Sequence, residues 1–172
     1  MAEGYRAAAA QLGVVLRPMV EADYAFCEAL YASTRLEELA PLGWPAEAVR
    51  QFLAQQHRAQ HLHYQQHYAG AQWWIVESAG CPLGRLYVFE GASDIRIVDI
   101  ALLPKARGQG IGGALIEGVQ RHAAAQGKRV SIHAEKNNPA RSLYFRLGFV
   151  VIDADRGAYD LLEWRPQGPA DQ

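Results

Sequence analysis

The feature that most constrains the fold is a glycine-rich segment, Arg107–Gly112, that follows a strand-like stretch and leads into a helix-like one. The strand-like residues end at Leu103, and Pro104 separates them from the segment. Glycine removes the Cβ atoms that would keep a ligand from the backbone, and the first N–H groups of a helix have no partner within it. Such a helix start binds phosphate. The segment therefore predicts an anion site, and the alternative is a turn that only lets the helix pack closely on the strand.

The residues around this segment exclude two other kinds of phosphate-binding loop. A P-loop needs Lys and then Ser or Thr after its second glycine, and this chain has Gly112, Gly113 and Ala114 there. A dinucleotide-binding loop follows the first strand of a βαβ unit, whereas this segment follows the fourth predicted strand. The sequence therefore predicts neither a magnesium-nucleotide site nor a dinucleotide site.

The rest of the pattern predicts an α+β domain with a mixed, largely antiparallel central sheet and helices on both faces. The stretch Ala46–His67 has no Pro or Gly and follows Pro45, so it is expected to be one long helix. Grouped strands with helices between some of them favour an antiparallel sheet with one parallel step. The other expected helices are 21–33, 112–126 and a short one around Tyr144, and the expected strands are 14–17, 72–77, 83–89, 95–103, 129–134, 149–152 and 158–164. Residues 1–13 are expected to be an N-terminal extension, 14–165 the domain, and 166–172 a flexible tail.

Composition and charge limit the partners. Half of the 172 residues are apolar, the net charge is −1 and the pI is about 6.6. This balance gives no broad positive surface, so neither nucleic acid nor a membrane is expected as a partner. Two cysteines are too few for a disulfide framework. With no stretch typical of a signal peptide or a membrane span, these features predict a cytoplasmic protein.

Two motifs in this order carry a family resemblance. Arg107, Gly110 and Gly112 have the spacing Arg-x-x-Gly-x-Gly after a strand ending in Leu102-Leu103-Pro104. The pattern Ala-x-x-Leu-Tyr-x-x-x-Gly-Phe follows, filled by Ala140, Leu143, Tyr144, Gly148 and Phe149. Both motifs resemble those of the GNAT superfamily of N-acetyltransferases. The resemblance implies an enzyme that transfers an acetyl group from acetyl-CoA to a primary amine by direct attack, without a metal.

The resemblance does not identify the amine acceptor. A small-molecule amine is expected because the chain shows no strong charge for a polymeric partner. A peptide amine is an alternative acceptor, which would make the protein an N-terminal or lysine acetyltransferase. The rival from another class is a catalytically silent acyl-CoA-binding sensor. A homodimer is left open.

The resemblance also implies where acetyl-CoA binds. The pantetheine arm is expected along the backbone of Leu102 and Leu103, and an N–H near Leu102 is expected to stabilise the oxyanion. Either Asn137 or Asn138 is expected to cap the short helix and bond the pantetheine amide. Arg146 is either a ligand of the ribose phosphate or a solvated helix residue. The N–H groups implied for the pyrophosphate are those of Arg107, Gly108, Gln109, Gly110, Ile111 and Gly112.

Tyr144 is the implied proton donor to the leaving thiolate, and the alternative is a tyrosine that fills the core. The general base is left open among three candidates. Asp99 is a charge in an apolar strand, which indicates either a site residue or an ion-pair partner for Arg85 or Arg96. His133 lies next to the expected active site, where a neutral imidazole accepts a proton. Water is the third candidate.

The first half of the chain, around 35–68, is expected to select the acceptor. Trp44 is its candidate binding residue, because an indole face can hold a cationic amine. Four histidines form two pairs at helical spacing, and a polar helix face is favoured over a metal site because no acidic third ligand is suitably spaced. These are His57, His61, His63 and His67.

Overall fold

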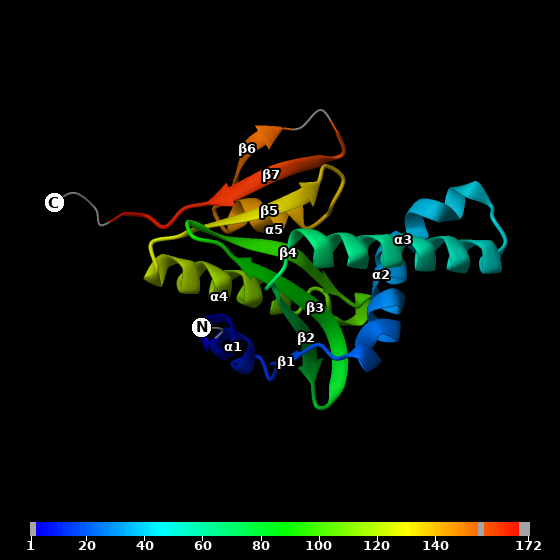
Figure 1. Cartoon of the computed structure of the whole chain (residues 1–172), viewed down its shortest axis with the longest axis horizontal. Helices are drawn as coiled ribbons and strands as arrows, with labels where there is room; N and C mark the ends of the chain where they lie inside the picture. Colours follow the sequence, from blue (N-terminus) through cyan, green and yellow to red (C-terminus); the bar gives the residue numbers. More distant parts are fainter. Residues whose placement is uncertain (1–2, 155–156, 169–172) are drawn as a thin grey trace.

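The computed structural model describes residues 3–154 and 157–168. Its centre is a seven-stranded sheet in the order β1-β2-β3-β4-β5-β7-β6 (Figure 1). Every pair of neighbours is antiparallel except β4 and β5, which are parallel. The strands are β1 (Val15–Pro18), β2 (Gln72–Ser78), β3 (Cys81–Glu90), β4 (Asp94–Leu102), β5 (Arg129–Glu135), β6 (Val150–Ala154) and β7 (Tyr159–Trp164). The predicted α+β fold with one parallel step is therefore confirmed.

Helices cover both faces of this sheet, as predicted. The long helix α3 has the predicted bounds, and α2 continues past Ser33 because the chain has no proline before Pro41. The helices are α1 (Glu3–Ala10), α2 (Tyr24–Leu39), α3 (Ala46–His67), α4 (Ile111–Ala125) and α5 (Arg141–Arg146), and the short 3₁₀ turns are η1 (Glu21–Asp23), η2 (Ala40–Leu42) and η3 (Pro104–Ala106). The start of α3 and its connection from α2 project beyond the sheet (Figure 1).

The hydrophobic core lies between the sheet and α4. Ile97, Ile132 and Leu162 from three neighbouring strands pack in one buried cluster with Leu115 of α4 and with Tyr144 of α5. The opposite face of the sheet carries polar and aromatic side chains that contact α2 and α3. The two faces therefore differ in chemistry, apolar toward α4 and polar toward α3.

The segment 1–13, predicted as an extension, contains helix α1, which packs on α4. Tyr5 and Ala8 of α1 are buried, and a Cβ atom at Gly118 of α4 would come within 2.6 Å of the Tyr5 Cα. Only a glycine at this position lets the two helices approach so closely. Residues 1–2 lie outside the described part of the chain, as do residues 169–172 of the predicted tail.

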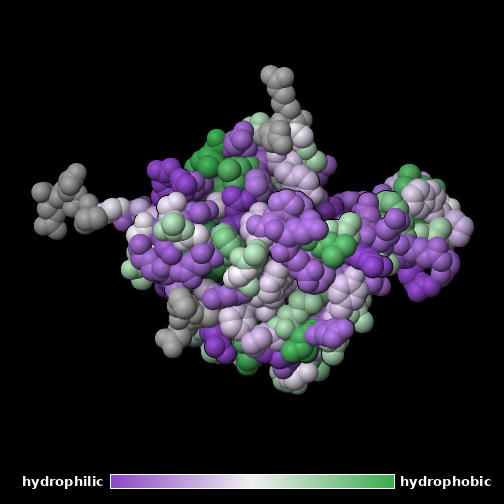
Figure 2. Space-filling view, viewed as in Figure 1, coloured by the Kyte–Doolittle hydropathy of each residue, from purple (hydrophilic) through white to green (hydrophobic). Residues whose placement is uncertain are grey.

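The view in Figure 2 shows a mostly hydrophilic surface over α3 and an apolar patch over the edge strand β6. The patch comes from Val150, Val151 and Ile152, each at least 40% exposed. None of the helices in the described residues combines the length and the apolarity that crossing a bilayer requires.

Candidate active site

The central strands β4 and β5 pair over only part of their length and then separate. Asp94–Ile97 of β4 pairs with Arg129–Ile132 of β5. Beyond these residues β4 continues to Leu102 along β3, and β5 continues to Glu135 along β7. The hydrogen bonding between the two strands therefore leaves a gap in the middle of the sheet, with the α3 face on one side and the α4 face on the other.

A β-bulge in β4 at the start of the gap decides which side chains face which helix. Ile97 is opposite Val88 and Asp99 is opposite Tyr87, so Val98 is the extra residue. Without this bulge, strand alternation would place Asp99 on the apolar α4 face. With it, Asp99 faces α3.

The end of β4 presents backbone groups to the gap. The N–H of Leu103 donates to the carbonyl of Leu83 at 2.7 Å, so Leu103 bonds to β3. In an antiparallel pair the residues alternate between pointing toward and away from the partner strand, so the N–H of Leu102 points to the gap. Of the two leucines predicted to meet the pantetheine arm, Leu102 is the one with a donor directed there.

The glycine-rich segment connects η3 to α4. Gly108 and Gly110 have positive φ angles of 72° and 81°, and Gly110 is the N-cap of α4. A Cβ atom at either glycine would meet no described atom within 4 Å, so the space beside this backbone is open. Arg107 is exposed, and its Nε donates to the carbonyl of Leu102 at 3.0 Å. An open turn at a helix N-terminus suits a phosphate.

The other members of the predicted loop differ in burial. Ile111 is 5% exposed and packs in the core, and Gln109 bonds the carbonyl of Lys105. Gly112 lies against Leu102 and Leu143, 3.8 and 3.9 Å from where its Cβ would be. The segment thus sits directly over the end of β4, and its phosphate-binding role stays a prediction.

Helix α5 places Tyr144 beside the gap. The side chain is 3% exposed, and its ring lies 6.1 Å from the ring of Phe149. Burial and, to a smaller degree, the charge of Asp99 raise the pKa of Tyr144 to about 12, so the phenol keeps its proton at neutral pH. Tyr144 packs in the buried cluster on the α4 face, whereas Asp99 faces α3, so the two groups lie on opposite faces of the sheet.

Asparagine and arginine candidates near α5 occupy different environments. The side chain of Asn138 accepts a hydrogen bond from the N–H of Ala140 at 2.9 Å, so Asn138 orders the turn that leads into α5. Asn137 is exposed, and Arg146 is exposed in the last turn of α5. Their predicted contacts with coenzyme A remain predictions.

On the α3 face, Asp99 belongs to a buried polar cluster. Arg85 of β3 is 3% exposed, and its Nη2 donates to Asp99 Oδ2 at 2.8 Å and to Gln60 Oε1 at 2.8 Å. The hydroxyl of Tyr64 donates to the same Asp99 oxygen at 2.9 Å. Of the two ion-pair partners considered for Asp99, the structure has Arg85.

The histidine next to this cluster is neutral. His57 is fully buried, and its Nε2 lies 3.3 Å from Arg85 Nη1. Burial and then the charge of Arg85 lower the pKa of His57 to about 4, so the uncharged ring accepts the arginine N–H. Arg85 is thus surrounded by acceptors from α3 and β4.

His133 lies on the same face of the sheet, on the β5 side of the gap. Arg96 donates to its Nδ1 at 2.7 Å and to Ser131 Oγ at 2.8 Å. An arginine has no acceptor, so Nδ1 contributes its lone pair, and the neutral ring carries its proton on Nε2. In this tautomer His133 has no lone pair left for an incoming proton.

A second polar cluster, not found by sequence reasoning, closes the α2 side of the gap. Arg35 of α2 holds both carboxylate oxygens of Glu135 at the end of β5, with Nη1 2.9 Å from Oε2. The hydroxyl of Tyr159 of β7 also donates to Glu135, at 2.9 Å. Hydrogen bonding to Arg35 is the main cause that lowers the pKa of Glu135. The Arg35–Glu135–Tyr159 bridge therefore links three elements.

Sequence signals existed for only part of these clusters. Tyr64, Gln60 and His57 lie on one side of α3 at helical spacing, and a polar stripe on the inner side of a helix indicates buried partners. The bridge gave no such signal, because Arg35 and Glu135 are 100 residues apart.

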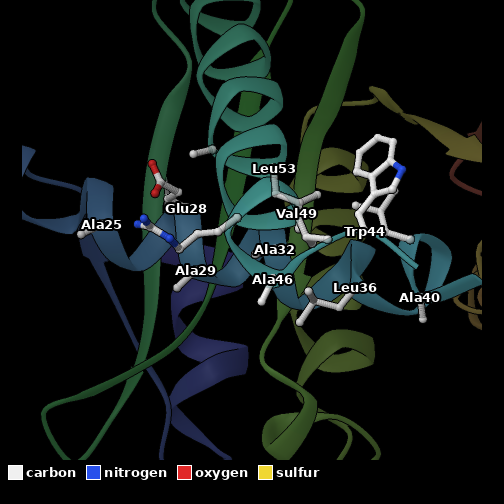
Figure 3. A pocket seen from close by; sticks show the side chains of 13 residues that line it. Ala25, Glu28, Ala29, Ala32, Leu36, Ala40, Trp44, Ala46, Val49 and Leu53 are labelled. Atoms are coloured by element: carbon white, nitrogen blue, oxygen red, sulfur yellow. The ribbon is translucent and has the colours of Figure 1, made fainter. Parts of the chain in front are cut away.

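Trp44 lies away from these groups, in an apolar groove of about 510 Å³ between α2 and the start of α3 (Figure 3). The indole is 43% exposed and lies edge to face with Phe52, with ring centres 5.3 Å apart. In Figure 3 it stands at one end of the groove and Glu28 at the other. No other predicted site residue is among the residues that line this groove in the described chain.

The four histidines of α3 do not converge. His63 and His67 stack with ring centres 4.0 Å apart, while His57 is buried against Tyr24 and Tyr31. Within the described ranges, no three or more His, Cys, Asp or Glu side chains are close enough together to hold a metal ion.

Comparison with known families matches the part of the chain that contains the gap, the glycine-rich segment and α5. Residues 69–151 match the family model described as acetyltransferase (GNAT) domain. The chain contains a GNAT acetyltransferase domain. The predicted GNAT-type acyltransferase is therefore confirmed, and helices α2 and α3 lie outside the matched residues.

Solved structures resemble this GNAT domain in fold. The PaiA N-acetyltransferase from Thermoplasma acidophilum, solved with coenzyme A, has a TM-score of 0.68 at 15% identity, over 89% of this chain and 99% of that one. An acetyltransferase from Thermus thermophilus has a TM-score of 0.65 at 16% identity, over 89% and 97% of the two chains. RimL, a ribosomal L7/L12 alpha-N-protein acetyltransferase, has a TM-score of 0.58 at 18% identity, over 88% of each chain. None of the curated proteins matches the sequence.

Proposed function

We propose that this protein is an acetyl-CoA-dependent N-acetyltransferase that acts on a small primary amine. The observation that carries the proposal is the gap between β4 and β5, with a protonated phenol on one side and a carboxylate on the other. The GNAT match covers the gap, and two similar structures contain coenzyme A.

The residues at the gap fit the cosubstrate. Acetyl-CoA supplies a thioester, whose pyrophosphate would lie on the N–H groups around Gly110, where the space beside the backbone is open. The N–H of Leu102 is directed to the gap, as a donor to the developing oxyanion must be. Arg107 lies at the same place and adds a positive charge close to the phosphates.

Two side chains then divide the proton transfers. As the amine nitrogen bonds to the carbonyl carbon and the carbon–sulfur bond breaks, Tyr144 gives its proton to the sulfur. Asp99 takes the proton that the nitrogen loses, and the two residues return to their starting states through solvent. We assign the base to Asp99 over His133, because Arg96 occupies the Nδ1 lone pair of His133.

The approach from the α3 side supports a small acceptor. The Arg35–Glu135–Tyr159 bridge joins α2 to β5 and β7 across this side of the gap. A bridged opening favours a small amine over a polypeptide, which needs an open groove for its backbone.

The test measures thiol release from acetyl-CoA with a panel of amines: an aliphatic monoamine, a polyamine, an aromatic amine, an amino acid amide and a peptide. We expect release that depends on the amine, with the acetylated product found by mass spectrometry and with small amines turned over faster than the peptide. Binding of coenzyme A without release for any amine would make the protein an acyl-CoA-binding module. Faster turnover of the peptide would reverse the acceptor assignment.

A further inference from the structure

The carboxylate of Asp99 is held by one oxygen only. Both the Arg85 guanidinium and the Tyr64 hydroxyl donate to Oδ2, at 2.8 and 2.9 Å. The other oxygen, Oδ1, has no bonded partner among the described residues and is not one of the buried unpaired atoms. One oxygen thus carries the structural bonds and the other is available to a ligand.

The two donors to Asp99, Arg85 and Tyr64, come from different elements and affect the carboxylate differently. Arg85 comes from β3 and already balances the charge of Asp99 in a buried ion pair. Tyr64 comes from α3, the helix on the acceptor side, and adds no charge. A second donor on the same oxygen fixes the rotation of the carboxylate, because one bond alone leaves the carboxylate free to turn about it.

Packing does not require the Tyr64 hydroxyl. The ring lies among other aromatic rings, with centre distances of 6.4 Å to Trp73 and 6.3 Å to Tyr87. A phenylalanine would fill this place equally well. Burial and then the charge of Asp99 raise the pKa of Tyr64, so the phenol is held as a permanent donor.

We infer that Tyr64 is a positioning residue: its hydroxyl orients the Asp99 carboxylate so that Oδ1 receives the proton of the attacking amine. This inference rests on the proposed function. One hydrogen bond then connects helix α3, on the side from which the amine arrives, to the base Asp99. An amine whose binding shifts α3 therefore changes the orientation of the Asp99 carboxylate.

The test compares Tyr64→Phe with Tyr68→Phe, the same change four residues later, at the residue that caps the C-terminal end of α3. Tyr68 contacts Phe89 and Tyr64 by its ring and makes no hydroxyl bond among the described residues. With the best amine of the panel, we expect Tyr64→Phe to lower kcat by roughly ten-fold or more, the effect of losing a hydrogen bond to a charged group. The KM for acetyl-CoA and the binding of coenzyme A stay unchanged, and Tyr68→Phe behaves as wild type.

The pH profile gives a readout that packing alone would not move. The groups around Asp99 are Arg85 and Tyr87 of β3, His57, His61 and Tyr64 of α3, Cys27 of α2, and Tyr144 of α5. Loss of a donor disfavours the charged carboxylate, so the acid limb of the pH profile should move to higher pH in Tyr64→Phe. An unmoved limb, with kcat equal to that of Tyr68→Phe, would overturn the inference.

A second measurement separates this inference from the proposed function. If the wild type releases no thiol with any amine, the proposed function fails while the carboxylate can still be followed by NMR in protein labelled with ¹³C at the aspartate carboxyl carbons. The signal that disappears in Asp99→Asn identifies Asp99. We expect its titration midpoint to rise in Tyr64→Phe and not in Tyr68→Phe, and an unchanged midpoint refutes the orienting bond.

Discussion

The two sides of the gap differ in the groups that face it: backbone groups on one side and side chains on the other. On the α4 side, the proposed contacts with acetyl-CoA come from backbone groups: the N–H of Leu102 and the N–H groups around the left-handed glycines 108 and 110. On the α3 side, the groups that face the gap are long side chains in ion pairs: Arg85 with Asp99, which is buried, and Arg35 with Glu135, which is partly buried. The first side lies within the residues that match the GNAT family, and so do Arg85, Asp99 and Glu135. Of these ion-paired side chains, only Arg35 lies outside the match, as do the helices α2 and α3.

Under the proposed function, this difference would let such a domain keep one cosubstrate while its acceptor changes. A backbone site depends on a few glycines and on strand geometry, and it places strict limits on sequence. A site made of side chains can change by single substitutions while the sheet stays the same. The proposed acceptor side is therefore where we expect specificity to change at low cost to the fold.

The largest expected effect is a fall in kcat, caused by a substitution of Tyr144 on the cosubstrate side of the gap. Tyr144→Phe removes the proton donor to the thiolate and keeps the ring, so kcat should fall by roughly 10² to 10⁴, the range for losing a general acid. Because the pKa of Tyr144 is raised to about 12, the donor stays protonated across the neutral range. Steady-state rates measure the fall in kcat, and coenzyme A titrations should show that binding of coenzyme A changes little.

The matched control is Tyr5→Phe, another buried tyrosine that lies in α1 and bonds Gln72. It should change stability but not kcat. If Tyr144→Phe turns over as fast as Tyr5→Phe, water protonates the thiolate, and Tyr144 belongs to the core it packs in.

The next effect concerns binding at the glycine-rich segment. At a hundred times its dissociation constant, coenzyme A should stabilise the folded protein by about 2.7 kcal/mol. Gly110→Asp should remove this gain, because it puts a Cβ and a negative charge where the pyrophosphate is expected. Thermal melts with and without coenzyme A measure the gain.

Gly127→Asp is the control for backbone strain. Gly127 follows the other end of α4, has a positive φ of 64° and, like Gly110, has no described atom within 4 Å of an added Cβ. Both variants should melt at a lower temperature without ligand, since L residues are strained at positive φ. Only Gly127→Asp should keep the shift with coenzyme A. If coenzyme A raises the melting temperature of the two variants equally, the pyrophosphate does not bind at the glycine-rich segment.

Local rules explain why most of the fold was predictable. The bounds of α3 follow from Pro45 and the absence of later breakers, and the hairpin between β2 and β3 follows from Ala79 and Gly80, both at positive φ. Helix α1 was missed because its eight residues make little more than two helical turns, too short a stretch for a helical repeat to stand out. Its packing depends on Gly118, more than a hundred residues away.

The candidate site divides in the same way. The segment around Gly110 and the helix of Tyr144 carry local motifs, so the sequence alone was enough to predict a role for each, and these roles stay predictions. The bulge at Val98 decides that Asp99 faces α3, and the strand pattern gave no sign of it. Contacts such as Arg35 with Glu135 arise only when distant elements meet, and a side-chain pair leaves no periodic trace in either segment.

The smallest expected effect concerns Trp44 and tests whether this residue binds the amine acceptor. Its indole is partly exposed in the groove between α2 and α3, where its face can hold a cationic amine at about 0.5–2 kcal/mol. Trp44→Ala should therefore raise the acceptor KM several-fold and leave the acetyl-CoA KM unchanged.

Two further variants decide what the groove contributes. Trp44→Phe keeps an aromatic face and should restore most of the acceptor affinity, whereas Leu42→Ala, a change at another exposed apolar residue of the same connection, should have no effect. An equal rise of both KM values in Trp44→Ala would instead make the indole a packing partner of Phe52. The acceptor would then be selected at the Arg35–Glu135–Tyr159 bridge. That outcome predicts that Tyr159→Phe, which removes one hydrogen bond to Glu135, changes the ranking of the amines while Trp44→Ala does not.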